Sequence, residues 1–167
     1  QKKGTIKEAT AFRPLDEMII QGPQLQVGNP INKTPRRGCK NFQDYETTDL
    51  ASLPEDYLPR TNFGPRVPMN EYRRRITKCR WDPSKSHGDF YRIALRNMIA
   101  LNGERSLVSA VIPPKMLHVD LVESIALRDN FTLLNFSGLF FSLVYDFLVK
   151  ASGISNLRTS FARRLPY

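Results

Sequence analysis

The chain has 167 residues, and its 25 Lys and Arg against 16 Asp and Glu give it a formal net charge of +9. Hydrophobic residues make up 41% of it, which excludes a wholly disordered basic tail and predicts one folded domain over 1–167. A positive excess of this size favours nucleic acid or another polyanion as the partner.

The sequence has two cysteines and two histidines, which narrows the chemistry available to it. Cys39 and Cys79 stand far apart, and His87 and His118 are separate as well. These counts favour a reducing, cytoplasmic setting and predict neither a disulfide framework nor a metal site. The chain opens on a polar, basic tripeptide instead of an apolar signal core, so we expect a fragment of a longer protein.

Residues 1–89 form the basic, proline-rich part of the chain. Nine of the twelve prolines fall before residue 84, which predicts strands and ordered loops in place of long helices. Residues 18–22 and 25–28 are predicted as short extended runs. An acidic stretch over 44–56 is followed by 57–85, where eight Lys and Arg face two carboxylates and supply +6 of the net charge.

Residues 90–167 have a different pattern, with strands predicted over 91–96 and 106–112. Residues 119–127 fit a strand or a short helix, and their Val and Ile content favours the strand. Residues 131–149 are strongly apolar and predict one long core helix that stops before Gly153. In that helix Leu134, Phe141 and Leu148 are expected to pack inside. The predicted fold class is α+β, with strands and ordered loops first and then a small sheet packed against one long apolar helix.

A membrane span is the alternative for residues 131–149, because their length approaches the roughly 20 residues that a span requires. Asn135, Gly138 and Asp146 interrupt the run, and a carboxylate at mid-membrane costs about 2.5 to 3.5 kcal/mol on insertion scales. The sequence therefore favours a core helix, with no membrane partner.

Two basic clusters are candidate DNA contacts. The first lies in a loop that contains proline and glycine, and the second lies beside Tyr72 and Trp81 and is interpreted as a strand on which Arg73 and Arg75 share a face. Such residues can neutralise phosphates or donate to guanine edges, although a solvated charged surface is the alternative. The candidates are Lys33, Arg36, Arg37 and Lys40 in the first cluster, and Arg73, Arg74, Arg75, Lys78 and Arg80 in the second.

Sequence patterns of catalysis are missing. No lysine has Asp or Glu two positions before it, as a restriction-type nuclease requires to hold a metal and polarise water. No Gly-x-Gly-x-x-Gly run is present, and Asn29-Pro30 is followed by Ile31 instead of Pro-aromatic, so no cofactor pocket or base-methylating motif is indicated. We therefore expect a non-catalytic chain, with no catalytic residue and no cofactor of its own.

Residues 90–167 carry a recognisable series of motifs: 91–94 (YRIA), 102–114 (NGERSLVSAVIPP), the apolar run 131–149, 156–157 (NL) and 163–166 (RRLP). This series resembles the C-terminal specificity region of adenine DNA methyltransferases from type IIG-like restriction-modification and related phage-defence systems.

The resemblance implies a target-recognition domain that grips duplex DNA and reads its bases. It implies as a second partner the catalytic methyltransferase domain of the same parent chain, where S-adenosylmethionine would bind. Arg105 and Arg158 lie within or next to the matching motifs and join the candidate DNA contacts.

Two other functions share the basic charge. An RNA-binding or ribosome-associated protein would present aromatic side chains on which single-stranded bases stack. A protein-interaction module would dock a partner on the apolar helix.

Overall fold

The computed structural model describes residues 4–166 and contains 26% helix and 25% strand. The predicted α+β class is confirmed. The strands are β1 (Ile6–Ala11), β2 (Ile19–Ile20), β3 (Lys33–Pro35), β4 (Tyr45–Thr47), β5 (Thr61–Pro65), β6 (Arg92–Arg96), β7 (Ser109–Ile112), β8 (Leu117–His118) and β9 (Val122–Ala126). The α-helices are α1 (Met69–Arg74), α2 (Asn130–Phe141), α3 (Leu143–Ala151) and α4 (Thr159–Ala162), and single 3-10 turns are η1 (Leu15–Glu17), η2 (Gly22–Gln24), η3 (Phe42–Asp44) and η4 (His87–Asp89).

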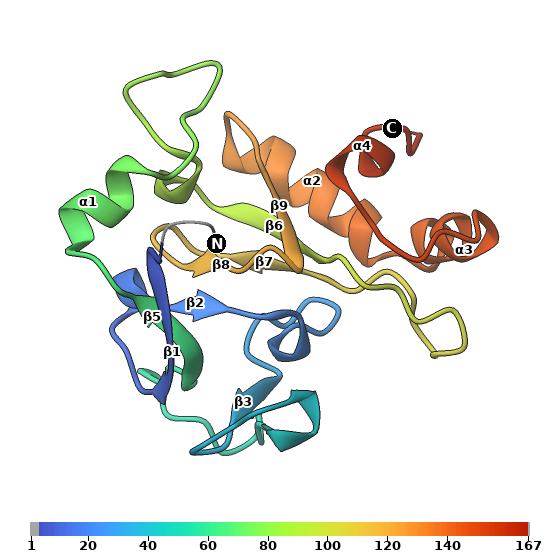
Figure 1. The fold of residues 1–167 in the computed structure, drawn as a ribbon. Coiled ribbons are helices and arrows are strands. Elements are labelled where there is room, and N and C mark those ends of the chain that lie inside the picture. The colour runs from blue at the N-terminus through green and yellow to red at the C-terminus, as the bar shows by residue number, and fades with distance from the viewer. Residues whose placement is uncertain (1–3, 167) are drawn as a thin grey trace.

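Three sheets make up the strand content. The order β1-β5-β2-β8 forms the first, β3-β4 the second and β7-β6-β9 the third. In Figure 1 the first two sheets lie on one side, helices α2, α3 and α4 lie on the other, and the third sheet runs between them. Strand β8 comes from the second half of the chain but pairs in parallel with β2, so the two halves share a sheet.

Strand β6 is buried on both faces and separates two hydrophobic cores. Ile93 and Leu95 pack with α2 and α3 in the helix-side core, whereas Ala94 packs with β2 in the strand-side core. Because successive side chains of a strand point to opposite faces, Arg92 and Arg96 lie on the face of Ala94. Both arginines therefore sit at the junction with the N-terminal strands.

The strands predicted over 91–96, 106–112 and 119–127 are present as β6, β7 and β9, with β6 antiparallel to both neighbours. The prediction for 18–22 and 25–28 is half correct. Ile19 and Ile20 form β2, but residues 25–28 form a turn, because Gly28 takes a φ of +73° and Gln26 bridges to Asn29.

The single helix predicted over 131–149 is wrong, because the chain forms two helices bent by 60° at Ser142. Ser142 is extended, and its hydroxyl accepts a hydrogen bond from the Tyr145 amide at 3.2 Å, which begins α3 afresh. Helix α3 then ends before Gly153, which takes a φ of +67° as the sequence predicts for a stop.

The bend also corrects the predicted buried face. Phe141 and Leu148 pack against the helix-side core, but Leu134 is 64% exposed, since α2 buries Leu133, Ser137 and Phe140 instead. Within residues 4–166, α2 and α3 reach the length and apolarity of a membrane span only together, as a bent pair, and no single helix does.

The strand predicted through Arg73 and Arg75 is also wrong, because residues 69–74 form helix α1. Pro68 precedes the helix with a φ of −52°, and its missing amide hydrogen has no cost at a helix start. Three successive arginines on a helical turn point in different directions and cannot line one edge together.

The burial of α2 and α3 predicts a large loss of stability for one phenylalanine of the bent pair and a small one for another. Phe140 is 2% exposed and Phe147 is 68% exposed. Phe140→Ala should lower the free energy of unfolding by about 3 to 5 kcal/mol through lost burial and a residual cavity, whereas Phe147→Ala should change it by about 0.5 kcal/mol or less. Urea denaturation of both variants measures this difference, and similar losses for the two would contradict the assignment of the buried face.

Candidate nucleic-acid interface

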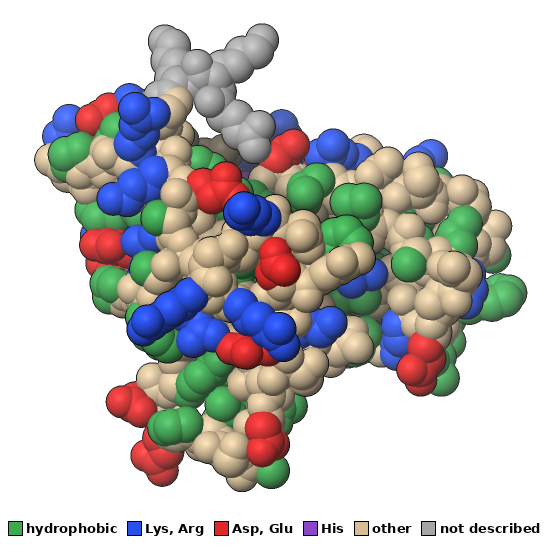
Figure 2. All heavy atoms as spheres, turned by 60° about the horizontal axis from the view of Figure 1, so that its bottom comes forward, with side chains coloured by type: hydrophobic (Ala, Val, Ile, Leu, Met, Phe, Trp, Pro, Cys, Tyr) green, Lys and Arg blue, Asp and Glu red, His purple; other side chains and the backbone are tan. Residues whose placement is uncertain are grey.

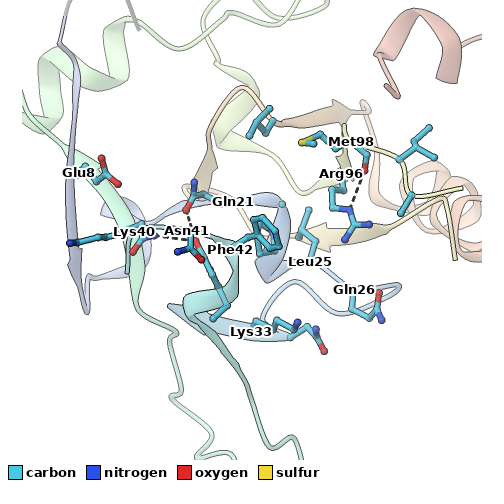
Figure 3. A pocket seen from close by; sticks show the side chains of 18 residues that line it. Glu8, Gln21, Leu25, Gln26, Lys33, Lys40, Asn41, Phe42, Arg96 and Met98 are labelled. Atoms are coloured by element: carbon cyan, nitrogen blue, oxygen red, sulfur yellow. Dashed lines mark hydrogen bonds between the residues drawn. The ribbon is translucent and has the colours of Figure 1, made fainter. Parts of the chain in front are cut away.

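A groove of about 610 Å³ lies where the N-terminal strands meet the end of β6. Figure 3 shows Lys40 and Glu8 on one side of it, Arg96 and Met98 on the other, and Phe42 between them. The lining residues are Glu8, Gln21, Gly22, Pro23, Leu25, Gln26, Asn32, Lys33, Lys40, Asn41, Phe42, Tyr45, Asn62, Arg96, Met98, Ile99, Ala100 and Leu121.

The groove is cationic. Lys33, Lys40 and Arg96 line it against a single carboxylate, that of Glu8. Within residues 4–166 none of the three cations forms an ion pair, and the Arg96 side chain donates only through Nε, to the Met98 carbonyl oxygen at 3.3 Å. Burial lowers the pKa of Arg96. These cations keep hydrogen-bond donors free for an anionic ligand.

Side-chain amides surround the cations. An amide offers one acceptor and two donors side by side, which is the pattern that an adenine edge complements. Gln26 and Asn41 are exposed, and Gln21 and Asn32 are half-buried, while Phe42 is 71% exposed. The groove therefore combines cations, amide donors and acceptors, and an exposed aromatic ring.

Hydrogen bonds fix the loop that carries Lys40 and Phe42. Asp44 accepts hydrogen bonds from the amides of Lys40 at 2.8 Å and Asn41 at 3.1 Å, and these bonds lower the pKa of its carboxyl. Beneath them the Asn62 amide donates to the Cys39 sulfur at 2.9 Å. The loop is thus positioned by local bonds and by β5, where Asn62 lies.

Gly22 gives Arg96 its place in the groove. A Cβ at residue 22 would lie 3.1 Å from Arg96 Cγ and 3.3 Å from Arg96 Cδ. The absence of a side chain at this position lets the guanidinium stem cross η2 and reach the groove.

The structure brings half of the first predicted cluster into the groove. Lys33 and Lys40 line it, whereas Arg36 and Arg37 lie on the exposed surface of the adjoining loop. Arg36 pairs with Glu46 at 3.6 Å, and Arg37 has no hydrogen bond or ion pair within residues 4–166. Figure 2 shows Lys and Arg side chains gathered in a band across the face presented by the lower part of Figure 1.

The second predicted cluster does not line the groove. Arg73 pairs with Asp16 at 2.8 Å, Arg75 pairs with Glu71, and Lys78 donates to the Ser84 carbonyl oxygen at 3.3 Å. Arg74 and Arg80 are exposed and have no intramolecular partner among the described residues. These cations lie around and after α1 and are partly neutralised by acidic neighbours.

Arg105 and Arg158 are held by contacts within the chain. Arg105 lies 3.4 Å from Asp146 and donates to the Phe141 carbonyl oxygen at 2.9 Å, which caps the end of α2. Arg158 pairs with Glu123 at 2.9 Å and faces Asp120 at 3.9 Å.

Sequence reasoning missed Arg96 and the amides of the groove. Arg96 ends the alternating run 91–96, and that alternation placed it on the face opposite Ile93 and Leu95, which was a usable signal. The amides lie in loops whose approach to β6 depends on the parallel pairing of β2 with β8. No local pattern reports that pairing.

No protein-family model matches the chain, and neither the curated proteins nor the solved structures give a match.

The contact between Gly22 and Arg96 predicts a graded defect. Gly22→Ala should displace the Arg96 side chain by a few tenths of an ångström or more and weaken polyanion binding, while leaving both cores packed. Heparin-column elution salt and melting temperature measure the two effects. Gly28→Ala is a poor control because of its positive φ, so Gly138, with open space around its Cβ position, provides the matched Gly→Ala change.

Arg105 is predicted to be needed for stability. Asp146 is 6% exposed and forms an ion pair with Arg105. Its carboxylate also accepts hydrogen bonds from the backbone amides of Ser106 at 2.8 Å and Leu107 at 2.6 Å. Removing one partner of a buried pair costs about 3 to 5 kcal/mol, so Arg105→Gln should lower the melting temperature markedly. An unchanged melting temperature together with lost DNA binding would instead place Arg105 in the DNA interface.

Proposed function

We propose that this chain binds duplex DNA in a sequence-specific manner, as the target-recognition part of a restriction-modification or phage-defence adenine methyltransferase. The observation that carries the proposal is the groove in which Lys33, Lys40 and Arg96 keep unpaired donors beside a set of side-chain amides. The motif resemblance of residues 90–167 supports the same function independently of that geometry.

The proposed roles of the five cations follow from how exposed their side chains are. Lys33, Lys40 and Arg96 neutralise phosphates of one DNA strand and fix the register of the protein on the duplex. Arg36 and Arg37 project from the loop beside the groove and reach base edges, to which a guanidinium can donate two parallel hydrogen bonds. Recognition then needs no catalytic residue in this chain.

The proposed second partner is the catalytic methyltransferase domain of the parent chain, which would hold S-adenosylmethionine and modify the adenine. A run of large, exposed apolar side chains on α2 and α3 supports a protein contact there, because patches of this kind mark interaction surfaces. Its members are Phe131, Leu134, Leu143, Val144 and Phe147. A cytoplasmic location belongs to the same proposal and is supported by the free thiols of Cys39 and Cys79.

RNA binding is the second candidate function, and the exposed ring of Phe42 favours it. The ring is 71% exposed in a cationic groove, where a splayed-out base could stack on it. Duplex DNA keeps its bases stacked on one another and makes less use of such a ring.

The double variant Lys33→Gln/Lys40→Gln tests the DNA proposal. The plot of log K against log salt concentration has a negative slope, and each lost phosphate contact should make it shallower by about 0.9. Loss of two contacts should therefore make the slope shallower by about 1.8. Fluorescence anisotropy with a labelled duplex between 50 and 200 mM salt measures that slope. The matched control is Lys115→Gln/Arg128→Gln, which removes the same charge at exposed positions outside the groove.

Equal slopes for the two double variants would show that net charge alone drives binding and would reject the groove.

Phe42→Ala separates the two candidate functions. It should leave duplex binding close to that of the parent protein, whereas a loss of single-stranded RNA binding worth about 1 to 3 kcal/mol would favour the RNA candidate.

A further inference from the structure

A second cavity of about 380 Å³ lies at the other end of β6 and shares no lining residue with the groove. We call it the Arg92 cavity. It is lined by Thr5, Tyr72, Arg75, Ile76, Thr77, His87, Arg92, Leu117, His118 and Ser124. No Asp or Glu is among these residues.

Arg92 is the unusual member of this set. It is 2% exposed, and within residues 4–166 it forms no ion pair with a carboxylate. Its Nε donates to the Phe90 carbonyl oxygen at 3.4 Å and its Nη2 to that of Met116, while Nη1 has no hydrogen-bond partner among the described residues. A guanidinium buried without a counter-ion is costly, and an anion in the cavity would offset that cost.

The positive charge of Arg92 affects the pKa of a neighbouring side chain. Burial lowers the pKa of Arg92 to about 10, and Asp89 raises it only as a secondary cause. The carboxylate of Asp89 is already engaged by the Ser86 amide at 2.7 Å and hydroxyl at 2.9 Å. Burial, and then the charge of Arg92, lowers the pKa of His87, so the Arg92 charge acts on the ring of His87 in the same lining.

Hydroxyl groups complete the donor set. The Ser124 hydroxyl is already used, because it donates to His118 Nε2 at 2.8 Å while the protonated Nδ1 of that ring donates to the Val119 carbonyl oxygen at 3.1 Å. Burial raises the pKa of Tyr72 to about 12, so its phenol keeps its proton and can donate. Thr5 and Thr77 add two further hydroxyls on the same lining.

We propose that the Arg92 cavity binds a phosphate group of a small molecule, with Arg92 as the buried cation and the hydroxyls of Tyr72 and Thr77 as further donors. The volume of about 380 Å³ lies within the roughly 300 to 1,000 Å³ of small-molecule pockets. Nη1 of Arg92 is left to donate to a phosphate oxygen, and such a charge-assisted hydrogen bond favours phosphate over chloride. The depth of Arg92 favours a terminal or free phosphate over the phosphodiester of a DNA duplex.

Trp81 is a built-in reporter for this cavity. It is the single tryptophan of the chain, and its ring stacks on that of His87 with 6.1 Å between centroids. Sodium phosphate titrated into the 167-residue protein, in exchange for sodium chloride at constant ionic strength, should change Trp81 fluorescence to saturation and raise the melting temperature. Adenosine monophosphate should act in the same way, and adenosine should not.

Three outcomes of these titrations would overturn the proposal. One is a Trp81 response that does not saturate, and another is an equal response to adenosine and its monophosphate. The third is a response to duplex DNA alone, which would assign the cavity to the DNA backbone.

Variants localise the site. Arg92→Lys retains a cation but loses the planar guanidinium donors, and Thr77→Val removes one hydroxyl, so each should weaken phosphate affinity by about tenfold or more. Arg128→Gln, at an exposed position outside the cavity, should leave the affinity unchanged. If Arg92→Lys fails to fold, Thr77→Val and Tyr72→Phe decide the matter, and an unchanged affinity in both would reject the site.

The groove and the cavity can fail separately. Lys33→Gln/Lys40→Gln should lose DNA affinity and keep the phosphate response of Trp81, because neither lysine lines the Arg92 cavity. Loss of that response in the double variant would show that the effect came from general electrostatics and would overturn the proposal.

Discussion

Strand β6 is buried on both of its faces, and the rest of the molecule is arranged around that constraint. Ile93 and Leu95 are covered by helices, and Ala94 is covered by the N-terminal strands. A strand placed between two layers needs apolar side chains in the middle of each face, which Ile93, Ala94 and Leu95 supply. The first and second halves of the chain are joined further by the parallel pairing of β2 with β8.

The same alternation generates both candidate binding sites. Arg92 and Arg96 flank Ala94 on the strand-side face, roughly 13 Å apart at about 3.3 Å per residue. Ala94 packs into the strand-side core between the two arginines. Arg96 lines the groove at one end of β6, and Arg92 lines the Arg92 cavity at the other end. One strand thus supplies a cation to the groove and another to the Arg92 cavity.

Pairing among the charged residues separates the basic surface into two classes. Arg73, Arg75 and Arg158 face carboxylates from their own chain, which reduces the charge they offer to a polyanion. Lys33 and Lys40 have no such partner within residues 4–166. Local net charge alone is therefore a poor guide to the interface, because it counts paired and unpaired cations alike.

The sequence by itself determined the α+β class and the strands β6, β7 and β9, since alternation and β-branched runs are local signals. It also indicated the charge of the loop that carries Lys33 and Lys40. The bend at Ser142 and the helical form of α1 escaped it, because a serine cap and a preceding proline outweighed the apolar and charge patterns. Only the tertiary structure decided which cations meet in one groove and that Arg92 is buried without a carboxylate. Both depend on contacts between segments far apart in the sequence, and no local periodicity encodes those contacts.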